Sequence, residues 1–201
     1  QGERRCGVPT IKPWDMDTIR EKFALVQESE PFAIAMDIDA AGLPFCRLDA
    51  AGRQQERRGV KADRLLGAAS VHFKGHYDAR GAEKALEAGA SGIVVSNHGG
   101  RVLDHCPATA EVLPDIVDAV GGKMTIFVDG AIRSGMDMFK ALALGADAVL
   151  IGRPFVTTVY GGGEEGVQLY VQKLKAELAD TMRMCGAHSL ADIDRSMLYG
   201  F

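Results

Sequence analysis

The chain reads Ala-Gly-Ala-Ser-Gly-Ile-Val-Val at residues 88–95 and Leu-Gly-Ala-Asp-Ala-Val-Leu-Ile at residues 144–151. Each segment has the pattern of a helix end, a glycine turn and a short apolar run that can form a buried strand. A pattern that recurs within one chain indicates a repeated structural unit. We therefore expect repeated units of a strand and a helix, with the strands parallel and covered by the helices.

The same alternation continues on both sides of these two segments. Short apolar runs that suit strands cover residues 7–12, 32–37, 92–96, 125–128 and 148–151. Apolar residues at three- and four-residue spacing predict helices around residues 81–88, 108–120 and 136–144, a first helix capped by Asp15, and a final helix around Leu174. The chain therefore predicts an α/β fold.

Repeated units of this kind favour a TIM (β/α)8 barrel, in which a helix follows each strand. A doubly wound sheet also alternates strands and helices, but its Gly-x-Gly-x-x-Gly fingerprint after the first strand is absent here. We therefore predict a partial TIM barrel and treat residues 1–201 as one domain. The sequence alone leaves the doubly wound sheet as the alternative.

Composition and charge indicate a globular protein that handles a small molecule. The chain has 47% hydrophobic residues and a net charge of −4, so we expect neither nucleic acid nor a membrane as partner. The 4 cysteines are scattered without a Cys-x-x-Cys pair, which favours reduced thiols and predicts no metal site. No apolar stretch is long enough to span a bilayer, and the first residues lack the apolar core of a signal peptide. We expect a cytoplasmic protein.

The segment Ser-Asn-His-Gly-Gly-Arg-Val-Leu-Asp, residues 96–104, follows a predicted strand. In a barrel, reactive side chains gather where the strands end, because the following loops meet on one face. His98 can take a proton near neutral pH, and Arg101 can donate two hydrogen bonds to a carboxylate. The two glycines allow a flat ring to approach. A single histidine after a strand is more often structural than catalytic, but the full string is far more specific.

Two later strand ends carry a second kind of motif. Residues 129–135 read Asp-Gly-Ala-Ile-Arg-Ser-Gly, and residues 152–154 read Gly-Arg-Pro. Exposed glycine amides, a helix N-terminus and the arginines Arg133 and Arg153 can together bind a phosphate group, and barrels commonly bind phosphate after the seventh and eighth strands. Ordinary turns with solvated arginines are the alternative for either segment alone. Because both motifs occur, we predict a phosphate site.

Two further residues could act on the same site. Asp37 ends a predicted strand and could stabilise a protonated His98, although its alternative role is to cap a turn or a helix. Lys74 precedes Gly75 and could place positive charge against an electron-accepting ring, although it could equally be an exposed lysine. We include both residues in the predicted site.

With these motifs in place, the chain from residue 81 to about residue 194 resembles the FMN-dependent α-hydroxy-acid dehydrogenase and oxidase family. The resemblance implies FMN as the cofactor and the oxidation of a small 2-hydroxy acid to its 2-oxo acid. It implies that His98 is the catalytic base, that Asp37 is its partner, and that Arg101 binds the substrate carboxylate. The flavin contacts that it implies are Lys74, Ser96, His98, Gly99, Asp129, Gly130, Arg133, Gly152 and Arg153.

The sequence also departs from the pattern of that family. The predicted strands correspond to the third to eighth of the family's barrel, and six of eight strands cannot close it. Ala131 replaces the second glycine of the family's Asp-Gly-Gly-Ile-Arg motif, and the string Pro-Thr-Ile-Lys-Pro-Trp at residues 9–14 lacks the family's usual Gln and Tyr. We therefore expect an N-terminally truncated chain that is not a competent enzyme as written, whereas its intact relative oxidises 2-hydroxy acids and can form homo-oligomers.

Two other functions stay open from the sequence. The chain could be an inactive fragment that binds FMN weakly or not at all. It could also be another FMN-binding barrel enzyme, such as a flavin-dependent isomerase, which shares the phosphate motifs but does not need the pair His98 and Arg101. The sequence identifies neither the hydroxy acid nor the electron acceptor.

Between residues 44 and 81 the family resemblance is lost and basic residues accumulate, namely Arg53, Arg57, Arg58, Lys61 and Arg64. A nucleic-acid patch is one explanation, but the genetic code offers a better one. Codons can be chosen for residues 70–80 such that reading one base later gives Pro-Phe-Ile-Leu-Lys-Gly-Ile-Met-Thr-Pro, a strand that ends in the family's Lys-Gly. The same shift turns residues 55–62 into Lys-Ser-Val-Glu-Glu-Leu-Lys. We hypothesise that residues 47–80 are a frame-shifted translation, in which Lys74 stays a lysine.

Overall fold

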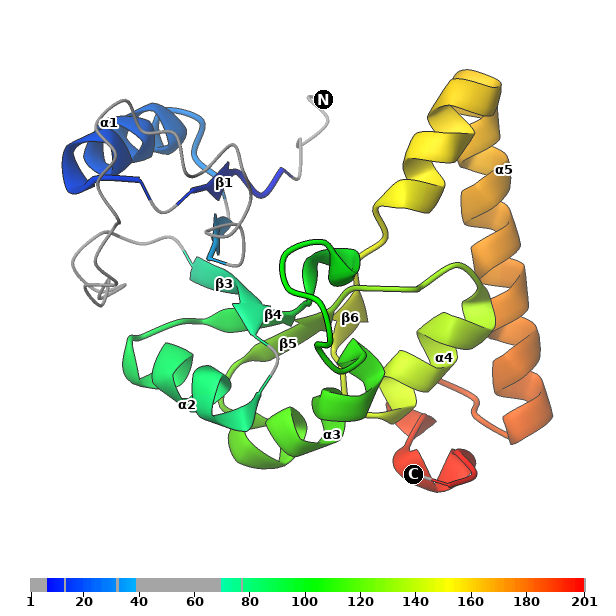
Figure 1. Ribbon diagram of the computed structural model, residues 1–201. Helices are drawn as coiled ribbons and strands as arrows, with labels where there is room; N and C mark the ends of the chain where they lie inside the picture. Colours follow the sequence, from blue (N-terminus) through cyan, green and yellow to red (C-terminus); the bar gives the residue numbers. More distant parts are fainter. Residues whose placement is uncertain (1–6, 13, 32, 39–69, 77, 201) are drawn as a thin grey trace.

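The computed structural model describes residues 7–12, 14–31, 33–38, 70–76 and 78–200, and its strands form one parallel sheet. The 6 strands are β1 (Thr10–Ile11), β2 (Ala33–Asp37), β3 (Ser70–His76), β4 (Gly92–Val95), β5 (Thr125–Val128) and β6 (Ala148–Val149). Each strand pairs in parallel with the next strand along the chain (Figure 1).

The order of the strands distinguishes the two folds that the sequence allowed. A doubly wound sheet reverses its strand order at a switch point, whereas a barrel keeps sequential strands as neighbours. Here the order β1-β2-β3-β4-β5-β6 follows the sequence without a reversal. The described part of the chain is therefore a section of a parallel α/β barrel, in which β1 and β6 do not pair with each other.

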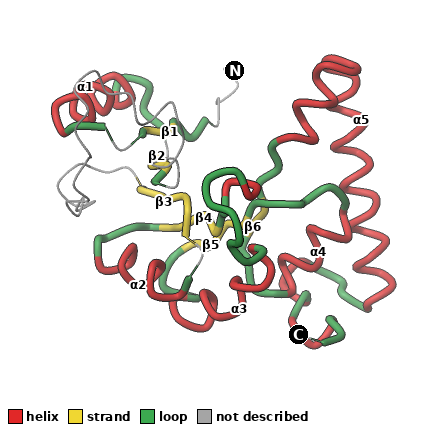
Figure 2. Tube along the Cα trace, in the orientation of Figure 1, coloured by secondary structure: helices red, strands yellow, loops and turns green. Residues whose placement is uncertain are grey.

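Helices connect and cover the strands (Figure 2). The helices between strands are α1 (Met16–Gln27), α2 (Ala79–Glu87), α3 (Thr109–Val120) and α4 (Gly135–Ala143). The remaining helices are α5 (Arg153–Cys185) and the short 3-10 helices η4 (His98–Gly100), η5 (Leu190–Asp192) and η6 (Arg195–Met197). In the packed arrangement α2 contacts α3, and α4 contacts α5.

Local sequence signals explain where the first helices begin. The carboxylate of Asp15 accepts a hydrogen bond of 2.9 Å from the backbone N–H of Thr18 and so caps α1, as predicted. Asp78 caps α2 in the same way through the N–H of Gly81. A side chain that satisfies the first N–H groups removes much of the cost of starting a helix.

The apolar strands and helix faces pack into one main core. β4 is buried along its whole length, as expected for a parallel strand with apolar material on both faces. The largest of the fully buried apolar side chains in this core are Ile19, Ile34, Ile93, Leu113, Ile116, Ile126, Val95 and Val120. They come from β2, β4 and β5 and from the helices α1 and α3, so the core lies between the sheet and its helical cover.

The elements expected from the sequence are all present, and most of them have shifted boundaries. The strand expected at residues 7–12 is reduced to Thr10–Ile11, and the one expected at residues 148–151 is reduced to Ala148–Val149. Each of these strands has a single partner among the described strands, which limits how far its ladder extends. The backbone N–H of Leu150 nevertheless donates to the carbonyl oxygen of Val128 at 2.9 Å, just beyond the end of β6.

β3 lies within the segment 47–80 that we interpret as frame-shifted. Its residues read Ser-Val-His-Phe-Lys-Gly-His, in which the apolar Val71 and Phe73 alternate with polar residues, a period that suits a strand. β3 pairs with β2 on one side and with β4 on the other, so it takes the place of the fifth strand of the barrel. Residues 47–69 lie outside the described residues, and the frame shift stays a hypothesis.

α5 consists of two helical arms joined by a sharp turn. Gly163 has a φ of 54° and a ψ of −139°, a conformation outside the helix that glycine adopts without the penalty of a Cβ. Figure 1 shows the first arm leading away from β6 and the second arm running back toward α4. A Cβ on Gly166 would lie 2.6 Å from the carbonyl oxygen of Thr158, so the two arms are in close contact. The second arm is thereby brought against α4.

Candidate active site

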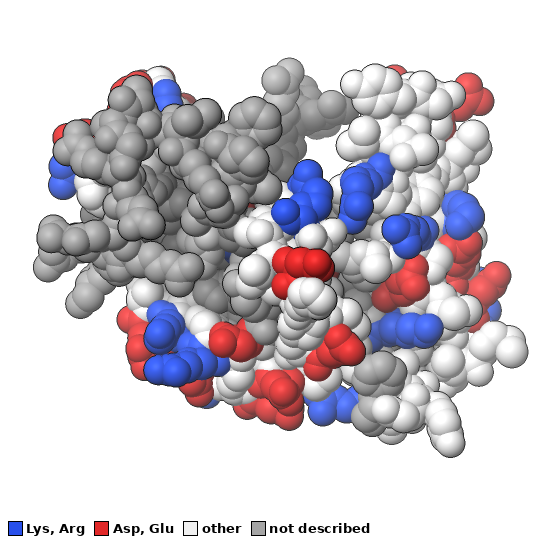
Figure 3. All heavy atoms as spheres, viewed as in Figure 1, with Lys and Arg blue, Asp and Glu red and all other residues white. Residues whose placement is uncertain are grey.

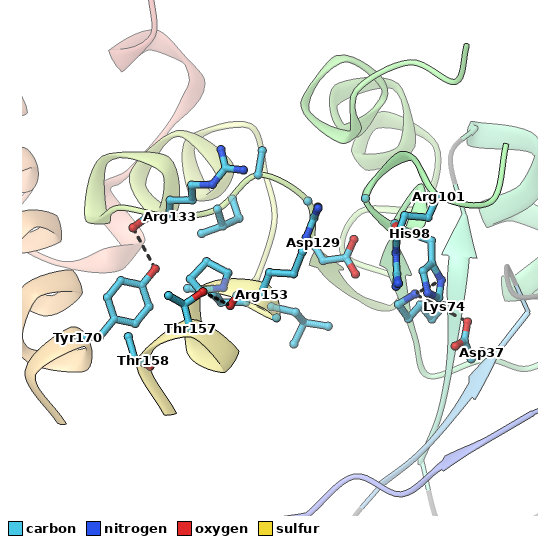
Figure 4. Close-up of a pocket in the computed structure, with 18 residues that line it drawn as sticks. Asp37, Lys74, His98, Arg101, Asp129, Arg133, Arg153, Thr157, Thr158 and Tyr170 are labelled. Carbon is cyan, nitrogen blue, oxygen red and sulfur yellow. Dashed lines mark hydrogen bonds and ion pairs between the residues drawn. The ribbon is translucent and has the colours of Figure 1, made fainter. Parts of the chain in front are cut away.

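One cavity of about 680 Å³ opens at the carboxyl ends of the strands. Small-molecule sites have volumes of roughly 300–1,000 Å³. Residues at the ends of β2 to β6 line the cavity, because parallel strands bring their carboxyl ends to one edge of the sheet. Figure 4 shows His98 and its neighbours at one side of the lining and Arg133 at the other, with Arg153 between them.

His98 lies in a loop of unusual backbone geometry after β4. His98, Gly99 and Gly100 have φ angles of 56°, 66° and 74°, all in the left-handed region. A residue with a Cβ costs roughly 1–2 kcal/mol in this region, so the surroundings must hold His98 in place. The backbone N–H of His98 donates to Oγ of the fully buried Ser96 at 3.1 Å. This bond supports the turn that presents His98 to the cavity.

Charged side chains from three neighbouring strands meet beside His98, and Figure 4 shows two of them, Lys74 and Asp37. Nζ of Lys74 lies 3.3 Å from Nδ1 of His98 and 3.7 Å from Oδ1 of Asp37. Nζ of Lys12, just after β1, pairs with Oδ2 of the same carboxylate. Asp37 is only 5% exposed, and a buried carboxylate needs such cationic partners. Lys74 thus contacts both Asp37 and His98.

Arg101 lies three residues after His98 and is anchored to the same loop. Its Nε donates to the carbonyl oxygen of His98 at 3.2 Å. Within the described part of the chain the two Nη groups of Arg101 make no hydrogen bond. Paired N–H donors of a guanidinium match the two oxygens of a carboxylate. Arg101 can therefore bind an anionic group next to the His98 ring.

The loops after β5 and β6 supply backbone donors at the other end of the cavity. In these two loops the lining residues with a backbone N–H that has no hydrogen-bond partner among the described residues include Gly130, Ala131, Ile132, Gly152 and Arg153. A Cβ on Gly99 would lie 2.6 Å from Nη2 of Arg153, so this guanidinium lies against the Gly99 backbone. Unpaired N–H groups beside two arginines are the donor set that a phosphate requires.

Ala131 follows Gly130 in the loop after β5 and has an unusual backbone conformation. Its φ is 60°, in the left-handed region that glycine adopts more easily. Its side chain is exposed at the cavity lining, so the cost of the Cβ lies chiefly in the backbone conformation of the loop.

The two helices that begin at the cavity differ at their N-termini. The backbone N–H of Arg133 donates to Oδ2 of Asp137 at 3.0 Å, and the N–H of Gly135 donates to Oε2 of Glu177 at 2.9 Å. Carboxylates of the protein therefore already occupy the start of α4. α5 begins after Gly152, which provides no side-chain cap. Of these two helices, α5 is the one whose positive end can face a phosphate.

Asp137 links the stability of the α4 start to pH. Burial raises its pKa, but hydrogen bonds from the Ser134 hydroxyl and from the N–H groups of Arg133 and Ser134 outweigh burial, so the pKa lies below its ordinary value. Such a group stabilises the fold above its unfolded-state pKa, and this contribution is lost as the pH falls through the folded-state pKa. We expect Asp137→Asn to lower the free energy of unfolding by about 1 kcal/mol at pH 7, with a smaller difference from wild type below about pH 4.

Urea unfolding of wild type and Asp137→Asn at pH 7 and at pH 3 measures both differences. Asp115→Asn is the control, because Asp115 is exposed on α3. Equal losses of stability in the two variants would contradict a specific role of Asp137 at the start of α4.

Asp129 supplies a hydrogen-bond acceptor at the cavity. Its Oδ1 is buried and has no hydrogen-bond partner among the described residues. Its backbone carbonyl oxygen accepts from Oγ1 of Thr109 at 2.7 Å, which fixes the turn after β5. A buried acceptor of this kind suits a ligand hydroxyl group. The cavity thus combines a buried acceptor with unpaired backbone donors, a set of groups that fits the ribityl phosphate of FMN.

The cavity carries an excess of positive charge. The cationic lining residues are Lys74, Arg101, Arg133 and Arg153, and the carboxylates are Asp37 and Asp129. Figure 3 shows Lys and Arg side chains gathered near the middle of the face that it draws. Four cations against two carboxylates favour anionic ligands. A phosphate and a carboxylate can therefore bind in the same cavity.

The structure brings all of the predicted site residues to this cavity except Ser96, which supports the His98 loop from a buried position. Sequence reasoning missed Lys12, whose contact with Asp37 follows from the pairing of β1 with β2. It also missed Thr157, Thr158 and Tyr170, which line the cavity from α5. Their positions in a helix carry no local signal, since only the turn at Gly163 brings Tyr170 back to the site.

Residues 65–200 match the FMN-dependent dehydrogenase family, which is more than half of the chain. The chain belongs to this family, whose cofactor is FMN. The match begins before residue 81, where we placed the start of the resemblance, and it includes β3 and Lys74.

Curated proteins that are similar to this chain are oxidases of 2-hydroxy acids. The chain is 49% identical over 126 residues to a peroxisomal (S)-2-hydroxyacid oxidase of Arabidopsis thaliana. It is 48% identical over 131 residues to an L-lactate oxidase of a Roseobacter species. These alignments cover 63% and 65% of this chain and 35% of each relative. The chain therefore spans about a third of the length of the curated relatives that it matches.

Solved structures extend the likeness over nearly the whole chain. A mandelate oxidase variant with (S)-mandelic acid is 33% identical, with a TM-score of 0.80 over 94% of this chain and 62% of that one. A protein of Pediococcus acidilactici described as a lactate oxidase is 30% identical, with a TM-score of 0.82 over 93% of this chain and 60% of that one. The predicted partial TIM barrel is confirmed.

The cellular location stays a prediction. Among the described residues, no helix combines the length and the apolar character needed to cross a bilayer. The Arabidopsis relative is named as peroxisomal, whereas the sequence led us to expect a cytoplasmic protein.

Proposed function

We propose that this chain is the FMN-binding and substrate-oxidising part of an enzyme that converts a small 2-hydroxy acid to its 2-oxo acid. The observation that carries the proposal is the single cavity that joins His98 and Arg101 to the phosphate-binding loops. Membership of the FMN-dependent dehydrogenase family and similarity to 2-hydroxy-acid oxidases support the same reaction.

The residues at one end of the cavity would hold FMN. The N–H groups of Gly130 and Gly152 and the guanidinium groups of Arg133 and Arg153 would bind the phosphate, and Asp129 would accept a bond from the ribityl chain. Gly99 has no side chain, which lets the guanidinium of Arg153 lie against its backbone. Lys74 would place its positive charge against the flavin ring. When bound, FMN supplies the acceptor for the two electrons of the oxidation.

The residues at the other end would act on the substrate. Arg101 would bind the carboxylate, and His98 would take the proton of the hydroxyl group. Nζ of Lys74 lies 3.3 Å from Nδ1 of His98, so this lysine lies beside the ring that would take the proton. Asp37 would then stabilise the imidazolium that forms.

A second candidate is a chain that binds FMN without turnover. The observation that favours it is the open sheet, because β1 and β6 do not pair with each other among the described strands. An unpaired strand edge exposes backbone groups and leaves apolar surface uncovered. The residues proposed to bind the phosphate lie in the loops after β5 and β6 and at the start of α5, so this part of the site could persist where the rest is incomplete.

Flavin absorbance distinguishes these candidates. We expect an intact enzyme that contains this chain to be yellow when loaded with FMN and to bleach without oxygen when lactate, glycolate or mandelate is added. A yellow protein that none of a panel of 2-hydroxy acids bleaches would support binding without turnover, or a flavin-dependent isomerase. A colourless protein that does not take up added FMN would contradict both the cofactor site and the proposed reaction.

Arg101→Lys is expected to raise KM for the hydroxy acid about tenfold, with a smaller change in kcat, because a lysine cannot donate the paired bonds of a guanidinium. Steady-state kinetics over a range of substrate concentration measures both constants. Arg183→Lys is the matched control, since Arg183 is exposed near the end of α5 and pairs there with Asp180. A KM that stays at the wild-type value in Arg101→Lys would remove Arg101 from substrate binding.

A further inference from the structure

We infer that Tyr170 is a positioning residue for the phosphate end of the site, an inference that rests on the proposed binding of FMN. Tyr170 lies on the second arm of α5, while the first arm begins at the phosphate-binding loop of Gly152 and Arg153. Its side chain lines the cavity. Its hydrogen bond goes to the loop that carries Arg133, so it acts through that arginine.

Two contacts fix the Tyr170 side chain, and Figure 4 shows the one with Arg133. Its hydroxyl donates to the backbone carbonyl oxygen of Arg133 at 3.0 Å. Its ring meets the ring of Phe155, on the first arm of α5, edge to face, with 5.2 Å between the centroids and 77° between the planes. Tyr170 therefore connects the loop after β5 with the helix that follows β6.

The hydrogen bond from Tyr170 completes the support of the Arg133 backbone. The N–H of Arg133 donates to Oδ2 of Asp137, and its carbonyl oxygen accepts from Tyr170, each at 3.0 Å. Arg133 itself is exposed at the cavity lining, so its guanidinium can reach a ligand. A side chain that starts from a fixed backbone loses less freedom when it binds an anion than one on a mobile loop. The support thus favours phosphate binding.

The same face of α5 also carries Glu177, whose carboxylate accepts a hydrogen bond from the first residue of α4, Gly135. Glu177 is seven residues after Tyr170, two helical turns along the same face, and its Oε2 accepts the N–H of Gly135 at 2.9 Å. Its Oε1 lies 2.6 Å from Nζ of Lys173. The hydrogen bonds from Lys173 and then from Gly135 lower the pKa of Glu177, so it stays ionised at neutral pH. The second arm of α5 therefore holds residues 133–135 at two points.

Tyr170 keeps its role as a donor at neutral pH. Burial raises the pKa of the Tyr170 hydroxyl above the ordinary tyrosine value. The hydroxyl therefore keeps the proton that it donates to the carbonyl oxygen of Arg133. Phenylalanine at this position would remove the donor and keep the ring that packs on Phe155. Tyr170→Phe therefore isolates the hydrogen bond from the ring contact.

The test compares FMN with riboflavin, which lacks the phosphate, in binding to the full chain. Tyr170→Phe is expected to weaken FMN binding roughly three- to tenfold, the effect of one hydrogen bond, and to leave riboflavin binding unchanged. Glu177→Gln, which weakens the hydrogen bond from the N–H of Gly135, should show the same selective loss of FMN binding. Tyr160→Phe is the matched control, because Tyr160 is 89% exposed on the first arm of α5. Fluorescence titration measures both flavins.

The possible results separate this inference from the proposed function. A loss that is selective for FMN in Tyr170→Phe and absent in Tyr160→Phe supports the inference. Equal losses for both flavins in Tyr170→Phe, or no loss for either, overturn the inference about Tyr170. In that case the proposed phosphate site still stands if the wild-type protein binds FMN more tightly than riboflavin. A wild-type protein that binds riboflavin as tightly as FMN, or binds neither, overturns the phosphate site and this inference with it.

Discussion

In an intact enzyme that contains this chain, replacing His98 by Gln is expected to slow the reduction of bound flavin by a 2-hydroxy acid roughly 100- to 10,000-fold, the usual contribution of a general base. Glutamine keeps a polar end on the side chain but cannot take a proton near neutral pH. FMN should stay bound, because the phosphate-binding loops follow β5 and β6 while His98 follows β4. Stopped-flow absorbance of the flavin without oxygen measures the rate.

His105→Gln is the matched control for this substitution. His105 also has a left-handed backbone, with a φ of 59°, but its side chain is 95% exposed. A glutamine there meets the same backbone constraint outside the cavity, so we expect a wild-type rate of flavin reduction. Unchanged reduction in His98→Gln would remove the role as base. Loss of flavin to the same extent from His98→Gln and Arg101→Lys would show that the two roles are misassigned.

The middle of the sheet could be predicted from the sequence because buried parallel strands leave continuous apolar runs. β5 matches its predicted bounds, 125–128, and β2 and β4 differ from theirs by one residue at one end. β1 and β6 are shorter than predicted, because each has one partner among the described strands and an apolar run does not reveal where pairing stops. The strand order needed the structure, since both candidate folds share the same alternation of elements.

β3 was the element that the sequence as written did not predict. The family match from residue 65 includes this strand, and its place between β2 and β4 puts Lys74 beside His98. A lysine at this position is common to both reading frames of our hypothesis, so the structure of β3 does not decide between them. Sequencing the source gene across residues 47–80 tests the frame shift directly.

The candidate site could be predicted where its residues follow strands. Motifs at the ends of β4, β5 and β6 converge because parallel strands end at one edge, which needs no knowledge of packing. The contacts between distant helices could not be predicted in this way. Glu177 occupies the start of α4 from 42 residues away, and Tyr170 reaches Arg133 across 37 residues. Both contacts depend on the turn at Gly163, which the sequence marks only as one glycine in a run of three.

Gly135→Ala is expected to lower the free energy of unfolding by about 3 kcal/mol, the upper part of the usual range for overpacking. Gly135 is the first residue of α4 and is buried against the second arm of α5. A Cβ there would lie 2.1 Å from the backbone nitrogen of Leu178 and 2.6 Å from the backbone carbonyl carbon of Glu177. Backbone atoms within a helix cannot move aside as the end of a side chain can, so α4 and α5 would have to separate.

Gly161→Ala is the matched control, because a Cβ at Gly161, on the first arm of α5, has no atom within 4 Å. Alanine is a better helix former than glycine by up to about 1 kcal/mol, so this variant should be slightly more stable than wild type. Urea unfolding of the two variants should therefore give changes of opposite sign. Similar changes in both would contradict the close packing of α4 on α5. Because separation would also displace Arg133, Gly135→Ala should weaken binding of FMN more than binding of riboflavin.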